Sequence, residues 1–133
     1  MNTIVVGHRG AGKTSFMRRV EGYFRSAGRR ARAVDLDEFI AAEADRGVSR
    51  IFSTEGEAGF RAWERRCFAK LVAQAGKSSV PWFLSVGAGW AGPVPKGWDC
   101  LWIRRPTDPD GRVFLDRPRL DLGLDPLQEY LGR

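Results

Sequence analysis

The first residues whose types and spacing could do chemistry occupy positions 7–14. Their sequence, GHRGAGKT, matches the pattern G-x-x-x-x-G-K-[S/T] at every fixed position. It stands between a short β-branched run at 3–6 and a segment with apolar residues at helical spacing, which is the context that a phosphate-binding loop requires. Its glycines let consecutive backbone N–H groups face one anion, and the following helix adds unpaired amides. We therefore predict that this loop binds the phosphates of a nucleotide.

The residues expected to contact ATP lie in this loop and in the first helical turn after it. Lys13 would reach the β- and γ-phosphates, and the Thr14 hydroxyl would ligate Mg²⁺. His8, the one histidine, occupies a variable position of the pattern and is interpreted as an ordinary loop residue. Arg112 is a further candidate near the adenine or the phosphates, although a solvated loop charge explains it equally well. The predicted nucleotide-binding set is Gly10, Ala11, Gly12, Lys13, Thr14, Ser15 and Arg112.

Two aspartates mark the end of the second predicted strand, at residues 31–36. In open α/β sheets, ligands bind outside the carboxyl ends of the strands. Strand alternation would place Asp35 and Asp37 on the same side and Leu36 on the other. One carboxylate could hold the hydration shell of Mg²⁺ while its neighbour accepts a proton from a substrate hydroxyl. The alternative is that Asp37 only caps the helix that follows.

The elements that must position these residues alternate between strand and helix. Hydrophobic patterning predicts strands at 3–6, 31–36, 80–86 and 101–103, and helices at 16–27, 38–45, 57–75 and 125–131, with a further helical turn capped by Ser49. The stretch 104–123 is rich in Arg, Asp and Pro, and is predicted to be an exposed, mobile loop. We expect one α/β domain over residues 1–133, with a P-loop NTPase-type three-layer fold: a central parallel sheet of about four strands flanked by helices.

Composition excludes several classes of protein. The chain has 133 residues, of which 43% are hydrophobic and 29% charged, as expected for one globular core. No apolar run approaches the roughly 20 residues that span a bilayer, and the start does not resemble a signal peptide. Cys67 and Cys100 are too few for a disulfide scaffold and are not spaced as a metal pair. We expect a cytoplasmic protein with no membrane partner.

The positive charge is concentrated at the start of the chain. Residues 1–34 hold eight Lys or Arg and one Glu, whereas the net charge of the whole chain is +6. A nucleic-acid-binding module would use such a surface, and its binding would fall steeply with salt and survive the loss of Lys13. The simpler interpretation is a solvated basic helix face that includes Arg18, Arg25 and Arg29. We expect no nucleic-acid partner.

Four segments resemble the shikimate kinase family, in the same order and at similar spacing. They are GHRGAGKT (7–14), VDLDEFI (34–40), IFSTEGEAGFRAWE (51–64) and LSVGAG (84–89). The most telling part is EGEAGFR (55–61), because P-loop proteins in general have no reason to carry it. In addition, RPRL (117–120) resembles the arginine-proline motif of the family's lid, which would correspond to the loop at about 104–123.

The resemblance implies transfer of the γ-phosphoryl group of ATP to a hydroxyl of shikimate, on the route to chorismate and the aromatic amino acids. On the donor side, it implies that Asp35 supports Mg²⁺ beside Thr14, and that Arg117 closes over the phosphates and neutralises charge. These roles complete the expected cofactor set of ATP and Mg²⁺.

On the acceptor side, the resemblance implies that Asp37 hydrogen-bonds the substrate hydroxyls and orients or deprotonates the attacking one. Arg61 would pair with the substrate carboxylate, although without the resemblance it reads more simply as a helix-surface arginine. The backbone amides around Gly87, Ala88 and Gly89 would approach the bound acid closely. The expected partner is therefore a shikimate-like hydroxy acid.

The chain departs from the family at its C-terminus, where it is shorter by about a helix and a strand. The family's second carboxylate-binding arginine has no clear counterpart, and Ala88 stands where the family has glycine. These differences leave a second hypothesis open: a related protein that binds ATP but phosphorylates another small molecule or has lost turnover. We expect a monomer, with a dimer as the alternative.

Overall fold

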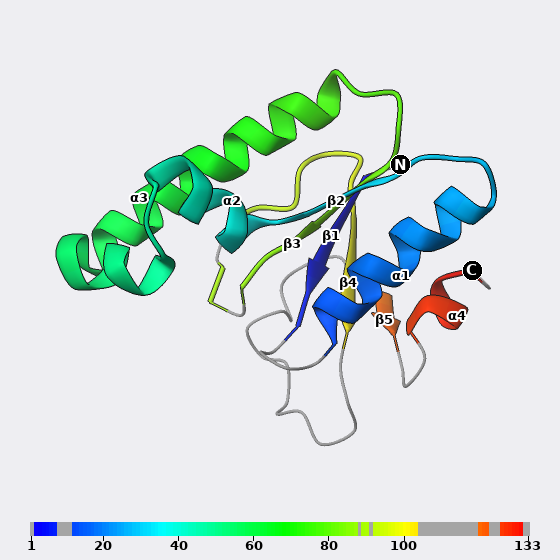
Figure 1. The fold of residues 1–133 in the computed structure, drawn as a ribbon, viewed down its shortest axis with the longest axis horizontal. Helices are drawn as coiled ribbons and strands as arrows, with labels where there is room; N and C mark the ends of the chain where they lie inside the picture. The colour runs from blue at the N-terminus through cyan, green and yellow to red at the C-terminus, as the bar shows by residue number, and fades with distance from the viewer. Residues whose placement is uncertain are drawn as a thin grey trace.

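The computed structural model describes residues 2–7, 12–87, 89–90, 92–103, 120–122 and 126–131. Strands and helices alternate through most of the chain (Figure 1). Their bounds are β1 (Thr3–Val6), α1 (Lys13–Ser26), β2 (Arg32–Asp35), α2 (Leu36–Ala44), α3 (Val48–Gly76), β3 (Trp82–Ser85), β4 (Asp99–Ile103), β5 (Leu120–Leu122) and α4 (Pro126–Leu131). The predicted α/β class and the four predicted strands are confirmed.

The strands form one sheet in the order β2-β3-β1-β4-β5, and every neighbouring pair is parallel. The fifth strand, β5, pairs with β4 in the register Leu101 with Leu120. It lies inside the range 104–123 that was predicted to be a loop, so that prediction is wrong for its last residues. Three residues are too few to show an alternation of apolar and polar side chains, which is why the sequence pattern missed them. The rest of the predicted lid, 104–119, lies outside the described residues.

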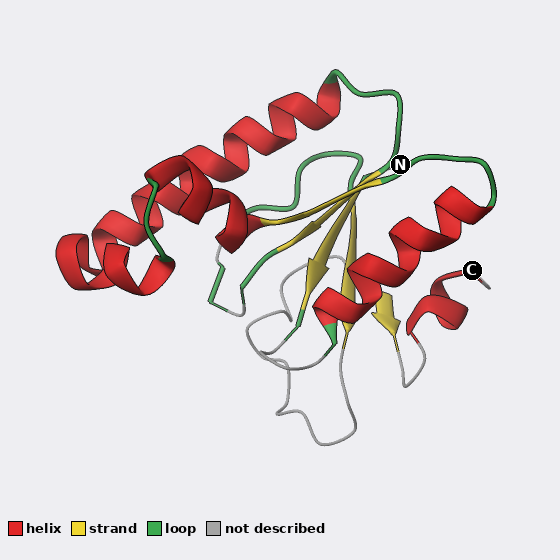
Figure 2. Ribbon diagram, viewed as in Figure 1, coloured by secondary structure: helices red, strands yellow, loops and turns green. Residues whose placement is uncertain are grey.

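The sheet separates two helical layers, as the three-layer prediction required (Figure 2). Along β1, Ile4 and Val6 pack into a core with α2 and α3, whereas Val5 packs into a second core with α1 and α4. Successive strand residues point to opposite faces, so a buried central strand can supply both cores. All four residues of β1 are buried.

The long helix α3 is broken at Gly56, whose φ of 71° and ψ of −177° are not helical. This break separates the short helical turn predicted after Ser49 from the helix predicted at 57–75, although Gly47 and not Ser49 occupies the N-cap. Glu55, just before the break, pairs with Arg46 and accepts a hydrogen bond of 3.3 Å from Trp63 Nε1. The bend therefore rests on a backbone conformation that favours glycine and on side chains that brace it.

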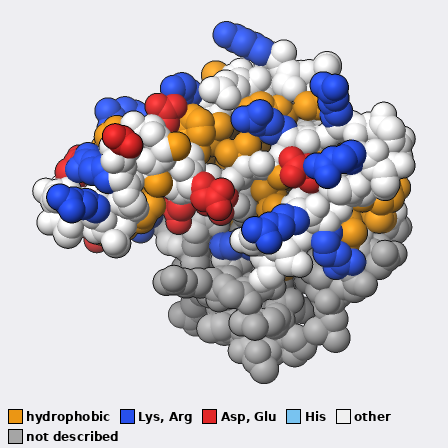
Figure 3. Space-filling view, in the orientation of Figure 1, with side chains coloured by type: hydrophobic (Ala, Val, Ile, Leu, Met, Phe, Trp, Pro, Cys, Tyr) orange, Lys and Arg blue, Asp and Glu red, His pale blue; other side chains and the backbone are white. Residues whose placement is uncertain are grey.

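The surface carries charges of both signs. Figure 3 shows Lys and Arg side chains distributed over one face of the molecule, with acidic and apolar side chains between them. Arg18, Arg25 and Arg29 are exposed, as expected for a solvated helix face. Among the described residues, no helix is both long and apolar enough to cross a membrane.

Candidate active site

After Gly7, the described residues of the phosphate loop resume at Gly12, which forms the N-cap of α1. Gly12 has φ 103° and ψ 17°, a left-handed conformation that a side chain would strain. No side chain among the described residues caps this helix end, and Lys13, Thr14 and Ser15 form its first turn. The amides and positive dipole end of α1 are thus available to an anion. Two predicted contacts, Gly10 and Ala11, lie outside the described residues, as does His8.

Lys13 lies between the carboxyl ends of two central strands. Its Nζ donates hydrogen bonds to the carbonyl of Gly7 at 2.7 Å and to that of Val86 at 3.1 Å. Burial lowers the pKa of Lys13 below its usual range, and the nearby carboxylates of Asp35 and Asp37 oppose this shift. A desolvated ammonium gains more from a polyanion than one in water does, because water screens it less.

Asp35, and not Asp37, caps the helix α2. Its Oδ1 accepts a hydrogen bond of 3.0 Å from the Glu38 amide, and its Oδ2 accepts one of 2.9 Å from the Ser85 hydroxyl. Because the helix begins at Leu36, Asp37 lies in its first turn and not on a strand. The prediction that strand alternation aligns the two aspartates is therefore wrong, and so is the alternative that Asp37 is the cap. They are nevertheless close enough that Asp35 raises the pKa of Asp37.

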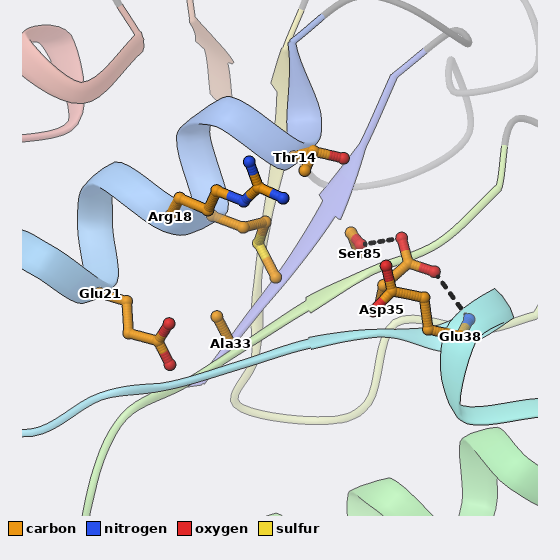
Figure 4. A pocket seen from close by; sticks show the side chains of 8 residues that line it. Thr14, Arg18, Glu21, Ala33, Asp35, Glu38 and Ser85 are labelled. Atoms are coloured by element: carbon orange, nitrogen blue, oxygen red, sulfur yellow. Dashed lines mark hydrogen bonds between the residues drawn. The ribbon is translucent and has the colours of Figure 1, made fainter. Parts of the chain in front are cut away.

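A pocket of about 150 Å³ opens beside Thr14, Asp35 and Ser85 (Figure 4). Its lining residues are Thr14, Met17, Arg18, Glu21, Ala33, Asp35, Glu38 and Ser85. The described residues contain no group of three or more His, Cys, Asp or Glu placed to hold a metal ion. Mg²⁺ is usually bound by one or two protein oxygens together with phosphates and water. The Thr14 hydroxyl and the Asp35 carboxylate are suitable oxygen donors.

Asp37 lies beside the loop that follows β3. A β-carbon built on Gly87 would be 3.8 Å from Asp37 Oδ2. Burial, followed by the charges of Asp35 and Glu64, raises the pKa of Asp37, while Lys13 and Arg61 partly counter the rise. A carboxylate with raised proton affinity is a better proton acceptor. Asp37 can therefore orient a hydroxyl group and take its proton.

Arg61 reaches the same loop from α3. Its Nη1 donates to both carboxylate oxygens of Glu64, at 3.0 and 3.2 Å, and its Nη2 lies 3.8 Å from Glu57 Oε1. Glu64 is only 5% exposed, whereas the side chain of Glu57 is 75% exposed. A β-carbon on Gly89 would lie 2.9 Å from Arg61 Nη2. The guanidinium is thus held from its own helix and lies directly against the loop after β3.

The structure therefore brings most of the described candidates together at the carboxyl ends of β1, β2 and β3. Lys13, Thr14 and Asp35 form one side, while Asp37 and Arg61 flank the loop at Gly87 and Gly89 on the other. Ser15 is exposed in the first turn of α1. The predicted site residues Ala88, Arg112 and Arg117 lie outside the described residues.

Two residues of this site were missed from the sequence. Ser85 pairs in register with Asp35 across the parallel strands β2 and β3, so the carboxyl-end rule would have found it. Glu64 shares the buried face of α3 with Phe60, Cys67 and Leu71. An acidic residue within an apolar stripe, three residues after an arginine, indicates a buried ion pair.

Comparison with known families settles the family of this chain. The family model described as shikimate kinase matches residues 9–90, which is more than half of the chain. The chain belongs to the shikimate kinase family. Members of this family are phosphotransferases that use ATP as a substrate. The resemblance drawn from the four sequence segments is confirmed.

Individual shikimate kinases match most of this chain, but the matched region is only about half of each relative's own length. A protein from Stenotrophomonas maltophilia strain R551-3 is 34% identical over 116 residues, covering 87% of this chain and 51% of that protein. One from Symbiobacterium thermophilum is 39% identical over 90 residues, covering 67% of this chain and 45% of that protein. The chain thus spans about half the length of the curated relatives it matches.

Solved structures of shikimate kinases share the fold. The enzyme from Acinetobacter baumannii, solved in complex with shikimate, superposes with a TM-score of 0.59 at 24% identity, covering 77% of this chain and 55% of that one. The enzyme from Aquifex aeolicus gives a TM-score of 0.57 at 20% identity, covering 88% of this chain and 65% of that one. At these identities the likeness establishes the fold.

Proposed function

We propose that this chain is a single kinase domain that transfers the γ-phosphoryl group of ATP to a hydroxyl of shikimate. The observation that carries the proposal is the meeting of Asp37 and Arg61 at the loop of Gly87 and Gly89, beside Lys13. A general ATP-binding loop does not require a hydroxyl-orienting carboxylate and a carboxylate-binding arginine next to it. A hydroxy acid substrate requires both.

On the donor side, the N-terminus of α1 and Lys13 would bind the phosphates of ATP. Lys13 would exchange its hydrogen bonds to the carbonyls of Gly7 and Val86 for phosphate oxygens. Thr14 and Asp35 would hold Mg²⁺, which when bound neutralises charge on the β- and γ-phosphates. Asp35 is itself fixed by Ser85 and by the Glu38 amide, so its carboxylate is oriented before any ligand arrives.

On the acceptor side, Arg61 would bind the substrate carboxylate, and Asp37 would accept a hydrogen bond from the reacting hydroxyl. As the hydroxyl oxygen attacks the γ-phosphorus, the bond from that phosphorus to the β–γ bridging oxygen breaks and ADP leaves, while the hydroxyl proton passes to the carboxylate of Asp37. The raised pKa of Asp37 favours this transfer. Holding both substrates in line supplies most of the catalysis in phosphoryl transfer.

The remaining roles rest on the family resemblance alone. Arg117 would neutralise charge on the phosphates, Arg112 would lie near the nucleotide, and the amides at Ala88 would approach the acid. We also propose that the protein is a cytoplasmic monomer.

The experiment is ADP release from Mg·ATP with and without shikimate, using the wild-type chain, Lys13→Ala and the matched control Lys77→Ala. Lys77 is exposed at the end of α3, remote from the phosphate loop in the chain. We expect shikimate-dependent ADP release that Lys13→Ala abolishes and Lys77→Ala retains. ATP binding without shikimate-dependent release would refute the proposal in favour of a paralogue with another substrate or no turnover.

A further inference from the structure

The loop after β3 meets helix α3 most closely where Gly89 faces the end of Arg61. A β-carbon at Gly89 would be 2.9 Å from Nη2, 3.7 Å from Nη1 and 3.8 Å from Cζ of that side chain. A separation below 3.0 Å is too short for real β-carbons. The guanidinium therefore occupies the space that any other residue at position 89 would fill with its side chain.

The backbone does not explain why this position is glycine. Gly89 is not among the glycines with positive φ, so its backbone conformation is open to alanine. Gly87, two residues earlier, would place a β-carbon 3.8 Å from Asp37 Oδ2, which is an ordinary van der Waals distance. Of these two glycines, only Gly89 has a neighbour that a methyl group would displace.

That neighbour is the tip of a flexible side chain and not backbone. A methyl group at position 89 would be accommodated by moving the guanidinium, with little change in the main chain. The movement would pull against the hydrogen bonds from Nη1 to Glu64, which fix the other side of the guanidinium. The end of Arg61 thus lies between the buried carboxylate of Glu64 on one side and the bare backbone of Gly89 on the other.

We propose that Gly89 is a positioning residue: its missing side chain sets where Arg61 presents Nη2 to the carboxylate of an acidic substrate. This inference rests on the proposed function for the identity of the substrate. From the sequence, we expect only that the backbone amide of Gly89 approaches the bound acid. The role proposed here is different, because Gly89 would act on the substrate through Arg61. A displaced guanidinium loses the planar, two-point geometry that carboxylate recognition needs.

The kinetic test compares wild type, Gly89→Ala, Arg61→Lys and the double variant, with Gly76→Ala as the matched control. Gly76 ends α3, and a β-carbon there would meet nothing within 4 Å. We expect Gly89→Ala to raise the KM for shikimate about tenfold, which is about 1.4 kcal/mol, with kcat and the KM for ATP changed less than twofold. Gly76→Ala should match wild type.

The double variant separates an effect through Arg61 from crowding of the substrate. A lysine head lacks the Nη2 that meets position 89, so Gly89→Ala should change KM less than twofold in the Arg61→Lys background. An equal tenfold effect in both backgrounds would overturn the proposal, because it would show direct contact with the substrate. An unchanged KM in Gly89→Ala would overturn it as well.

A measurement without substrate distinguishes failure of this inference from failure of the proposed function. The Nε–H resonance of Arg61 in a ¹⁵N spectrum should shift in Gly89→Ala and stay in place in Gly76→Ala. If wild type does not phosphorylate shikimate but the resonance shifts, the proposed function fails and the positioning role of Gly89 stands. If wild type is active and the resonance does not shift, the positioning role alone is refuted.

Discussion

The ion pair of Arg61 and Glu64 allows a prediction about stability that needs no ligand. Glu64 is 5% exposed and receives two hydrogen bonds from Arg61 Nη1, at 3.0 and 3.2 Å. Replacing Arg61 by alanine would leave a carboxylate buried without these donors. Breaking a fully buried ion pair in this way costs about 3–5 kcal/mol.

The expected loss here is smaller, because the side chain of Arg61 is 31% exposed and water can replace part of what it supplies. We expect Arg61→Ala to lower the free energy of unfolding by about 2 kcal/mol, within the range for a buried acceptor that loses its donor. For a domain of this size, that corresponds to a fall of roughly 7 °C in Tm. Adding Glu64→Gln removes the buried charge and should restore about half of the loss.

The assay is urea unfolding followed by tryptophan fluorescence, with Arg65→Ala as the matched control. Arg65 is the exposed neighbour on the same helix, and its removal should change the free energy of unfolding by less than about 0.5 kcal/mol. A loss in Arg61→Ala no larger than in Arg65→Ala would refute the reasoning. So would a loss that Glu64→Gln leaves unchanged, because the buried charge would then not be its cause.

Two further predictions concern the carboxylates. The raised pKa of Asp37 means that the folded protein binds this proton more tightly than the unfolded chain, so the resulting stability is complete below the ordinary value of 3.8 and is lost as pH rises through the folded pKa. Asp37→Asn should therefore unfold at higher urea concentration than wild type at pH 7 but not at pH 3.5. A stability difference independent of pH would contradict this explanation. The same variant should lose about 10²–10⁴-fold in kcat. Ser85→Ala removes the hydroxyl that orients Asp35 and should raise the Mg²⁺ concentration for half-maximal ADP release about tenfold, with the KM for shikimate unchanged. A rise in that KM alone would place Ser85 on the acceptor side instead.

The prediction for the nucleotide side of the site rests on local sequence signals. The pattern at 7–14 predicts a phosphate-binding loop from neighbouring residues alone, because its glycines, lysine and hydroxyl group follow a predicted strand and begin a predicted helix. The strand at Thr3–Val6 was predicted with its observed bounds, since a continuous β-branched run in a parallel sheet is buried on both faces. These features depend on neighbours in sequence.

The features that sequence reasoning missed depend on contacts between distant segments or on the end of an element. Asp35 and Asp37 were both recognised, but they were wrongly placed on the same face of a strand. The strand ends one residue earlier than expected, because Asp35 caps α2. The burial of Glu64 was not predicted, because the buried face of this helix was sought only from the spacing of apolar residues. The strand β5 is defined by its pairing with β4. Its three residues carry no sequence pattern that would predict this pairing.

The contacts of Arg61 explain why an arginine suits this position better than a lysine. One nitrogen, Nη1, serves the fold through the buried Glu64. Among the described residues, the carboxylate nearest to Nη2 is that of the exposed Glu57 at 3.8 Å, too long for a hydrogen bond. A substrate carboxylate can replace Glu57 at little cost, because exposed ion pairs contribute about 0–1 kcal/mol. It could not replace Glu64 without stranding a buried charge. A lysine has a single nitrogen for both tasks, so it would bind the acid only by releasing Glu64, whereas the planar guanidinium satisfies both carboxylates at once.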